Sequence, residues 1–130
     1  MEEDWQPKIL MVDNDERALD VLRNFLQNAG FEVTTAWSGE AAGNLLQSSK
    51  YDLVLVDDRF ADLTSGCFFA HLQEFRRKAP VVVMESAPSR PCGVTPYNAL
   101  RASRFVIKWR PCEVLETVRG ILSVPTVSND

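Results

Sequence analysis

Two uninterrupted apolar runs in this chain each end in an aspartate. The runs are residues 9–12 and 53–56, and the residues that follow them are Asp13 and Asp57. Continuous runs of Val, Ile and Leu are typical of parallel strands covered on both faces, and ligands bind just beyond the carboxyl ends of such strands. If the two strands are neighbours, five polar side chains converge there. These are Asp13, Asn14, Asp15, Asp57 and Asp58. So much negative charge in a small volume predicts a hard metal ion, and we expect Mg²⁺.

Length and composition limit the alternatives. The 130 residues, 45% of them hydrophobic, suit a single domain with a core at about 7–123 and tails at 1–6 and 124–130. The formal net charge of −4 gives no electrostatic reason to bind nucleic acid or an anionic membrane directly. No apolar run is long enough to span a membrane, and the acidic start does not resemble a signal peptide, so we expect a cytoplasmic location.

The hydrophobic periodicity predicts alternating strands and helices. In the helix at 16–29, Leu19, Leu22 and Leu26 share one face, and Val21 and Phe25 widen that apolar face. The expected elements in chain order are a strand at 9–12, that helix ended by Gly30, a strand at 31–36, a helix from the N-cap Ser38 to about 48, a strand at 53–56, a helix at about 68–79, strands at 81–84 and 105–107, and a last helix that begins near Pro111.

This order of elements predicts an α/β fold. Right-handed crossovers favour a doubly wound, five-stranded parallel sheet of the flavodoxin-like (βα)5 type, with strand order 2-1-3-4-5. That order places the first and third strands side by side and brings Asp13 next to Asp57. Pro88, Pro91 and Pro96 interrupt the stretch before the fifth strand, so we expect a shortened or irregular fourth helix there.

Four segments carry a resemblance to a known family. The segments are KILMVDND at 8–15, YDLVLVDD at 51–58, PVVVMES at 80–86 and FVIKW at 105–109, and together they resemble the receiver domain of two-component response regulators. The resemblance implies that Asp57 accepts a phosphoryl group from a partner's phosphohistidine. It also implies that Lys108 pairs with Asp57 at rest and then with the phosphoryl oxygens, and that Phe105 is an aromatic switch.

The same resemblance implies a set of magnesium ligands. They are the side chains of Asp13, Asn14 and Asp57 and the backbone carbonyl of Arg59. Asn14 stands where the family usually has a second acid, which predicts weak or absent Mg²⁺ binding.

Other positions also depart from the family's pattern. Glu85 stands where a hydroxyl residue usually binds the phosphoryl group, and like charges about 4 Å apart cost about 4 kcal/mol at an effective dielectric near 20. Ser86 replaces that hydroxyl only if the strand slips or bulges. Residues 58–66 lack the usual proline and are one residue longer. Trp109 replaces a proline that usually follows the lysine in a cis peptide; a cis bond without proline costs about 3 kcal/mol, and a trans bond is expected to redirect Lys108.

Three functions stay open at this point. The first is a phosphoacceptor signalling switch rather than a metabolic enzyme, with a sensor histidine kinase or phosphotransfer protein, an output domain or protein and a homodimer as candidate partners. The second is a pseudo-receiver that binds a protein partner without phosphorylation. The third is a haloacid-dehalogenase-like phosphatase, suggested by the spacing of Asp13 and Asp15 after an apolar strand. Against it, Lys108 follows Asp57 in sequence, whereas that family's lysine precedes its second acid cluster.

Overall fold

The computed structural model describes residues 6–58, 67–85 and 104–122. Strands and helices alternate along the chain, as the periodicity predicts. In chain order they are β1 (Lys8–Val12), α1 (Glu16–Asn28), β2 (Glu32–Ala36), α2 (Gly39–Ser48), β3 (Leu53–Asp57), α3 (Cys67–Arg76), β4 (Val81–Glu85), β5 (Arg104–Ile107) and α5 (Pro111–Leu122).

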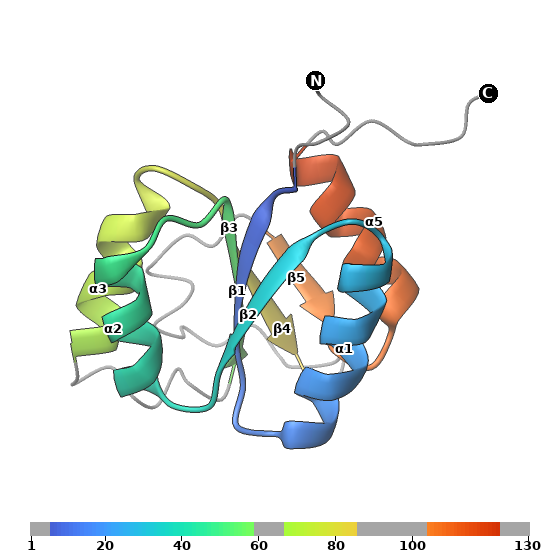
Figure 1. The fold of residues 1–130 in the computed structure, drawn as a ribbon, viewed down its shortest axis with the longest axis horizontal. Coiled ribbons are helices and arrows are strands. Elements are labelled where there is room, and N and C mark those ends of the chain that lie inside the picture. The colour runs from blue at the N-terminus through green and yellow to red at the C-terminus, as the bar shows by residue number, and fades with distance from the viewer. Residues whose placement is uncertain (1–5, 59–66, 86–103, 123–130) are drawn as a thin grey trace.

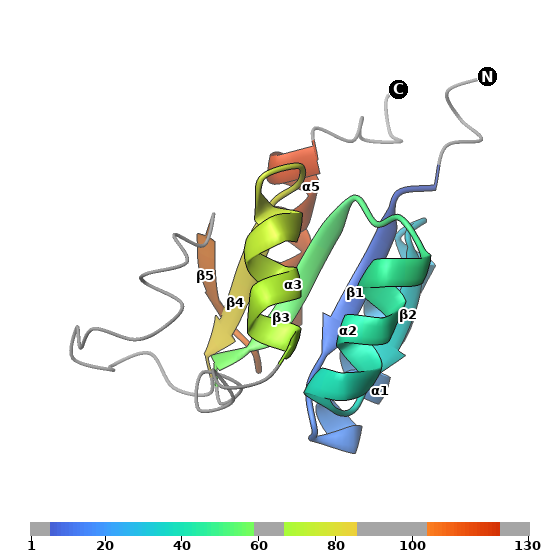
Figure 2. The same cartoon turned by 90° about the vertical axis from the view of Figure 1, so that its left-hand side faces the viewer.

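The five strands form one parallel sheet in the order β2-β1-β3-β4-β5. Helices α1 and α5 cover one face of this sheet and α2 and α3 cover the other (Figures 1 and 2). The predicted doubly wound fold and its strand order are therefore confirmed. The expected irregular fourth helix lies outside the described residues.

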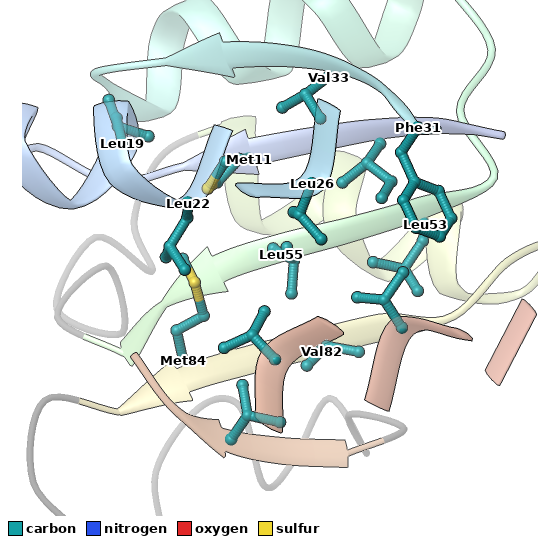
Figure 3. Close-up of a cluster of buried hydrophobic side chains, with 14 residues drawn as sticks. Met11, Leu19, Leu22, Leu26, Phe31, Val33, Leu53, Leu55, Val82 and Met84 are labelled. Atoms are coloured by element: carbon teal, nitrogen blue, oxygen red, sulfur yellow. The ribbon is translucent and has the colours of Figure 1, made fainter. Parts of the chain in front are cut away.

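The core has one layer on each side of the sheet because successive strand residues point to opposite faces. Figure 3 shows the layer beneath α1 and α5, where Met11, Leu55 and Met84 of three strands meet Leu22 and Leu26 of α1. The opposite layer, beneath α2 and α3, contains Leu10, Val12, Val54, Val56, Val81 and Val83 from the strands. The central strands are buried on both faces, which explains their continuous apolar sequences.

Local signals in the sequence fix several helix ends. The side chain of Asp15 caps α1, and the hydroxyl of Ser38 caps α2 by accepting a hydrogen bond from the Ala41 amide at 3.1 Å. Gly30 follows α1 with φ at +102°, in the region that favours glycine. The interpretation of Val21 was wrong: this side chain is 50% exposed and does not widen the buried face of α1. Over the described residues, every helix is too short or too polar to traverse a bilayer.

Candidate functional site

The sheet register brings Asp13 and Asp57 together. Val12 of β1 is paired with Val56 of β3, so the residue that follows each of them lies at the same edge of the sheet. The backbone amide of Asp13 donates to the carbonyl of Ala36 at 3.1 Å, which attaches this position to β2 as well. Both carboxylates are fully buried. The predicted neighbourhood of the two acids is therefore confirmed.

Lys108 follows the edge strand β5, and its side chain reaches both acids. Its Nζ lies 3.0 Å from Asp13 Oδ2 and 3.2 Å from Asp57 Oδ1, and only 1% of the side chain is exposed. Strand β4 lies between β5 and β3, a separation of two strand spacings or roughly 10 Å, so the long stem of the lysine and the side chains of the acids span it together. Its backbone amide donates to the carbonyl of Glu85 at 2.8 Å, which fixes the start of that stem against β4.

Burial dominates the electrostatics of Asp13. Desolvation raises the pKa of its carboxyl above the ordinary value of 3.8, and the nearby charge of Asp57 acts in the same direction. The backbone amide of Asp15, which donates to Asp13 Oδ1 at 2.9 Å, and the ammonium of Lys108 lower the pKa in part. The site is therefore a buried cluster of two carboxylates and one ammonium, and the pKa of Asp13 responds to both neighbouring charges.

The prediction that five polar side chains converge at this edge is only partly correct. Asp15 does not contribute its carboxylate to the cluster: its Oδ1 accepts hydrogen bonds from the amides of Arg17 at 3.1 Å and Ala18 at 3.4 Å, as the N-cap of α1. Its position one turn before the first apolar residues of α1 is a capping signal that the sequence already carried. Asn14 is exposed, and Asp58 is half-buried immediately after β3.

The oxygen donors at this edge suit a hard cation. Within residues 6–58, 67–85 and 104–122, no three Asp, Glu, His or Cys side chains come together as a metal-binding group. Two carboxylates, from Asp13 and Asp57, and the amide oxygen of the adjacent Asn14 remain as side-chain donors, and oxygen donors of this kind are those that Mg²⁺ prefers. The residues present therefore fit Mg²⁺ by type, with Lys108 as a competing positive charge.

The predicted switch residues lie on the last two strands. Glu85 ends β4 and is half-buried, and Phe105 of β5 is 40% exposed. By strand alternation, the side chain of Glu85 falls on the same face as Val81 and Val83. Ser86 and Arg59 lie outside the described residues.

The peptide between Lys108 and Trp109 is trans. With this trans bond, which was expected to redirect Lys108, the ammonium reaches both acids. Sequence reasoning also missed a contact of Trp109, whose ring centroid lies 5.3 Å from Lys108 Nζ. The signal was the adjacency of a lysine and an aromatic residue at the end of a strand.

Comparison with known proteins assigns the family. Residues 9–118 match the response regulator receiver domain. The chain belongs to this family. It is therefore a receiver domain of two-component response regulators, and such domains act in signalling.

Similar receiver domains occur within longer regulators. The transcriptional regulatory protein GlrR of Escherichia coli is 33% identical over 86 residues, which are 66% of this chain and 19% of GlrR. The regulatory protein VanRc of Enterococcus gallinarum is 29% identical over 115 residues, which are 86% of this chain and 48% of VanRc. This receiver domain thus spans about a fifth of the first relative and about half of the second.

Solved structures share the fold. A two-component response regulator from Clostridium difficile has a TM-score of 0.72 at 26% identity and covers 91% of this chain and 97% of its own. A CheY-like receiver domain protein from Methanospirillum hungatei has a TM-score of 0.75 at 20% identity, with 92% and 95% of the two chains covered. Both similarities extend over nearly the whole sheet and its helices.

Proposed function

We propose that this receiver domain accepts a phosphoryl group on Asp57. One observation carries the proposal: Lys108 Nζ lies 3.2 Å from Asp57 Oδ1 and 3.0 Å from Asp13 Oδ2, inside a buried cluster at the carboxyl edge of a doubly wound sheet. A carboxylate at this edge has an ammonium beside it before any anion arrives. The charge that a bound phosphoryl group brings is therefore met by a donor that is already in position.

The proposed transfer involves Asp57, Lys108 and Asp13. A carboxylate oxygen of Asp57 forms a bond to phosphorus while the phosphorus–nitrogen bond of a phosphohistidine breaks, and the electron pair of that bond leaves with the imidazole nitrogen. The ammonium of Lys108 then donates hydrogen bonds to the phosphoryl oxygens. Asp13 lies beside it and keeps the lysine oriented toward the reacting carboxylate.

Magnesium is part of the proposal. Asp13, Asp57, Asn14 and the backbone carbonyl of Arg59 would hold it, and when bound it would supply positive charge to the phosphoryl oxygens. The amide of Asn14 offers an oxygen without a negative charge, so the affinity for Mg²⁺ is expected to be weaker than with a second acid there.

The partners follow from the family. A sensor histidine kinase or a phosphotransfer protein would donate the phosphoryl group, and an output domain or protein would respond, since relatives of this chain are transcriptional regulators that extend well beyond it. Glu85, Ser86 and Phe105 are the proposed switch residues on the last two strands. Phe105 is 40% exposed in this structure, and the proposal is that it turns inward once the site changes charge.

A second function has its own support. Asn14 and Glu85 stand where the family's pattern has an acid and a hydroxyl residue. These features favour a pseudo-receiver, which would bind its partner through the same surface without phosphorylation. The family assignment supports a signalling domain rather than the phosphatase alternative.

Intact-mass spectrometry separates the two functions. We would incubate the protein with a small acyl phosphate, with Mg²⁺ or with a chelator, and compare the wild type with Asp57→Asn and Asp58→Asn. The phosphoacceptor proposal predicts one added phosphoryl group with Mg²⁺ in the wild type and in Asp58→Asn, and none in Asp57→Asn. A circular dichroism melt verifies that each variant is folded. An unmodified wild type would leave the pseudo-receiver, and loss of the adduct in Asp58→Asn alone would move the acceptor to the neighbouring residue.

A further inference from the structure

Trp109 lies beside the ammonium of Lys108. Among the described residues, no other ammonium contacts both buried acids. The ring centroid of Trp109 is 5.3 Å from Lys108 Nζ, within the range in which an aromatic face attracts a cation. The lysine is 1% exposed, whereas Trp109 is 49% exposed. The ammonium therefore has carboxylates as its partners toward the sheet and an indole that is half open to solvent as a further neighbour.

This arrangement differs from an ordinary surface contact between a lysine and a tryptophan. At an exposed site water competes for the ammonium and the attraction to the ring is weak, but the attraction grows when the cation is desolvated. Lys108 Nζ is desolvated and already has two hydrogen-bonded acids at 3.0 and 3.2 Å. The neighbouring ring, 5.3 Å from Nζ, therefore adds to the hold on the lysine.

We propose that Trp109 is a positioning residue that holds the Lys108 ammonium between Asp13 and Asp57. Its indole adds an aromatic neighbour 5.3 Å from the ammonium to the two carboxylates. A cation that binds the acids must then displace an ammonium held from two directions. Trp109 thereby sets the resting state of the site, and its effect on Mg²⁺ binding, though not the contact itself, rests on the function proposed above.

The direct test follows the ammonium without any metal. Exchange of the Lys108 ammonium protons with water, measured by ¹⁵N NMR in the presence of a chelator, would be compared in the wild type, Trp109→Leu and Trp109→Phe. Leucine keeps an apolar side chain and removes the π face, whereas phenylalanine restores a π face. Trp37→Leu is the matched control, because Trp37 is 60% exposed and follows β2.

The proposal predicts a graded result. Exchange becomes about fivefold faster in Trp109→Leu, which corresponds to about 1 kcal/mol, is close to the wild type in Trp109→Phe and is unchanged in Trp37→Leu. Equal rates in Trp109→Leu and the wild type would overturn the proposal. Equal acceleration by Leu and Phe would also overturn it, since packing rather than the aromatic face would then be responsible.

A Mg²⁺ titration of the same variants measures the consequence. Followed by the backbone amide shifts of residues 12–14, Trp109→Leu is expected to bind Mg²⁺ about threefold more tightly than the wild type, because its ammonium is displaced more easily. The two proposals fail separately. A change in ammonium exchange without any phosphoryl adduct would leave Trp109 as a positioning residue and refute the phosphoacceptor function, whereas an adduct on Asp57 with unchanged exchange would do the reverse.

Discussion

The ends of β1 and β3 and the ends of β4 and β5 build the site in different ways. On the first pair, continuous buried strands lead straight into Asp13 and Asp57, and the pairing of Val12 with Val56 sets the two acids side by side. On the second pair the flanking residues depart from the family's pattern, yet Lys108 still reaches both acids. The backbone register therefore fixes the positions of the two acids. The long side chain of Lys108, whose backbone is bonded to Glu85 and whose ammonium lies beside Trp109, connects the ends of β4 and β5 to these acids.

Replacing the connecting lysine is expected to have the largest effect. In Lys108→Met two buried carboxylates face each other without a positive charge, so the free energy of unfolding at neutral pH falls by about 3 kcal/mol. Urea denaturation in the presence of a chelator measures the loss. The matched control is Lys8→Met at an exposed position of β1, which is expected to stay close to the wild type. Similar small losses of unfolding free energy in both variants would show that the ammonium does not join the ends of β1 and β3 to the ends of β4 and β5.

The pH dependence of stability tests the raised pKa of Asp13 at the end of β1. The raised pKa of Asp13 means that the folded chain binds more protons than the unfolded chain between pH 3.8 and the folded pKa. This stabilising contribution is complete below pH 3.8 and is lost as the pH rises through the folded pKa. Each tenfold difference in proton affinity amounts to about 1.4 kcal/mol.

We therefore expect Asp13→Asn to gain stability relative to the wild type as the pH rises from about 4 to neutral, because asparagine carries no such penalty. Thermal melts of both proteins across this range, without divalent metal, give the difference. Parallel curves, or a difference that grows as the pH falls, would contradict the raised pKa.

The smallest predicted effect concerns Asp15, which belongs to α1 rather than to the acid cluster. Asp15→Ala removes the helix cap and lowers the free energy of unfolding by about 1 kcal/mol. Ser38→Ala is the matched control, since it removes the corresponding cap of α2, and a similar loss is expected. Neither change should alter the affinity for Mg²⁺ in an NMR titration. Weaker Mg²⁺ binding in Asp15→Ala alone would return Asp15 to the metal site.

Much of the fold was predictable because it depends on features that a sequence states directly. Apolar runs located the central strands, Ser38 and Gly30 marked helix ends, and the handedness of crossovers led to the strand order. The order in turn brought Asp13 and Asp57 together. The contact of Lys108 with Asp57 followed from the family resemblance, and the structure confirms it.

The remaining features depend on side-chain geometry that spacing does not encode. The sequence carried a capping signal at Asp15, but the same residue also follows Asp13 closely, and its hydrogen bonds to Arg17 and Ala18 show which of the two roles it has. The reach of Lys108 past a trans peptide depends on how its flexible stem crosses β4, and periodicity says nothing about that path. For the same reason the ring of Trp109 beside the ammonium was not predicted.

The central claim is that Asp13 lies in one buried cluster with Asp57 and Lys108, and a ¹³C NMR titration of the Asp13 side-chain carboxyl tests it most directly. In the wild type this carboxyl is expected to titrate above its ordinary pKa. The pKa should fall in Asp57→Asn, which removes a like charge, and rise further in Lys108→Met, which removes the ammonium. An Asp13 carboxyl that titrates at its ordinary value and responds to neither substitution would contradict the account.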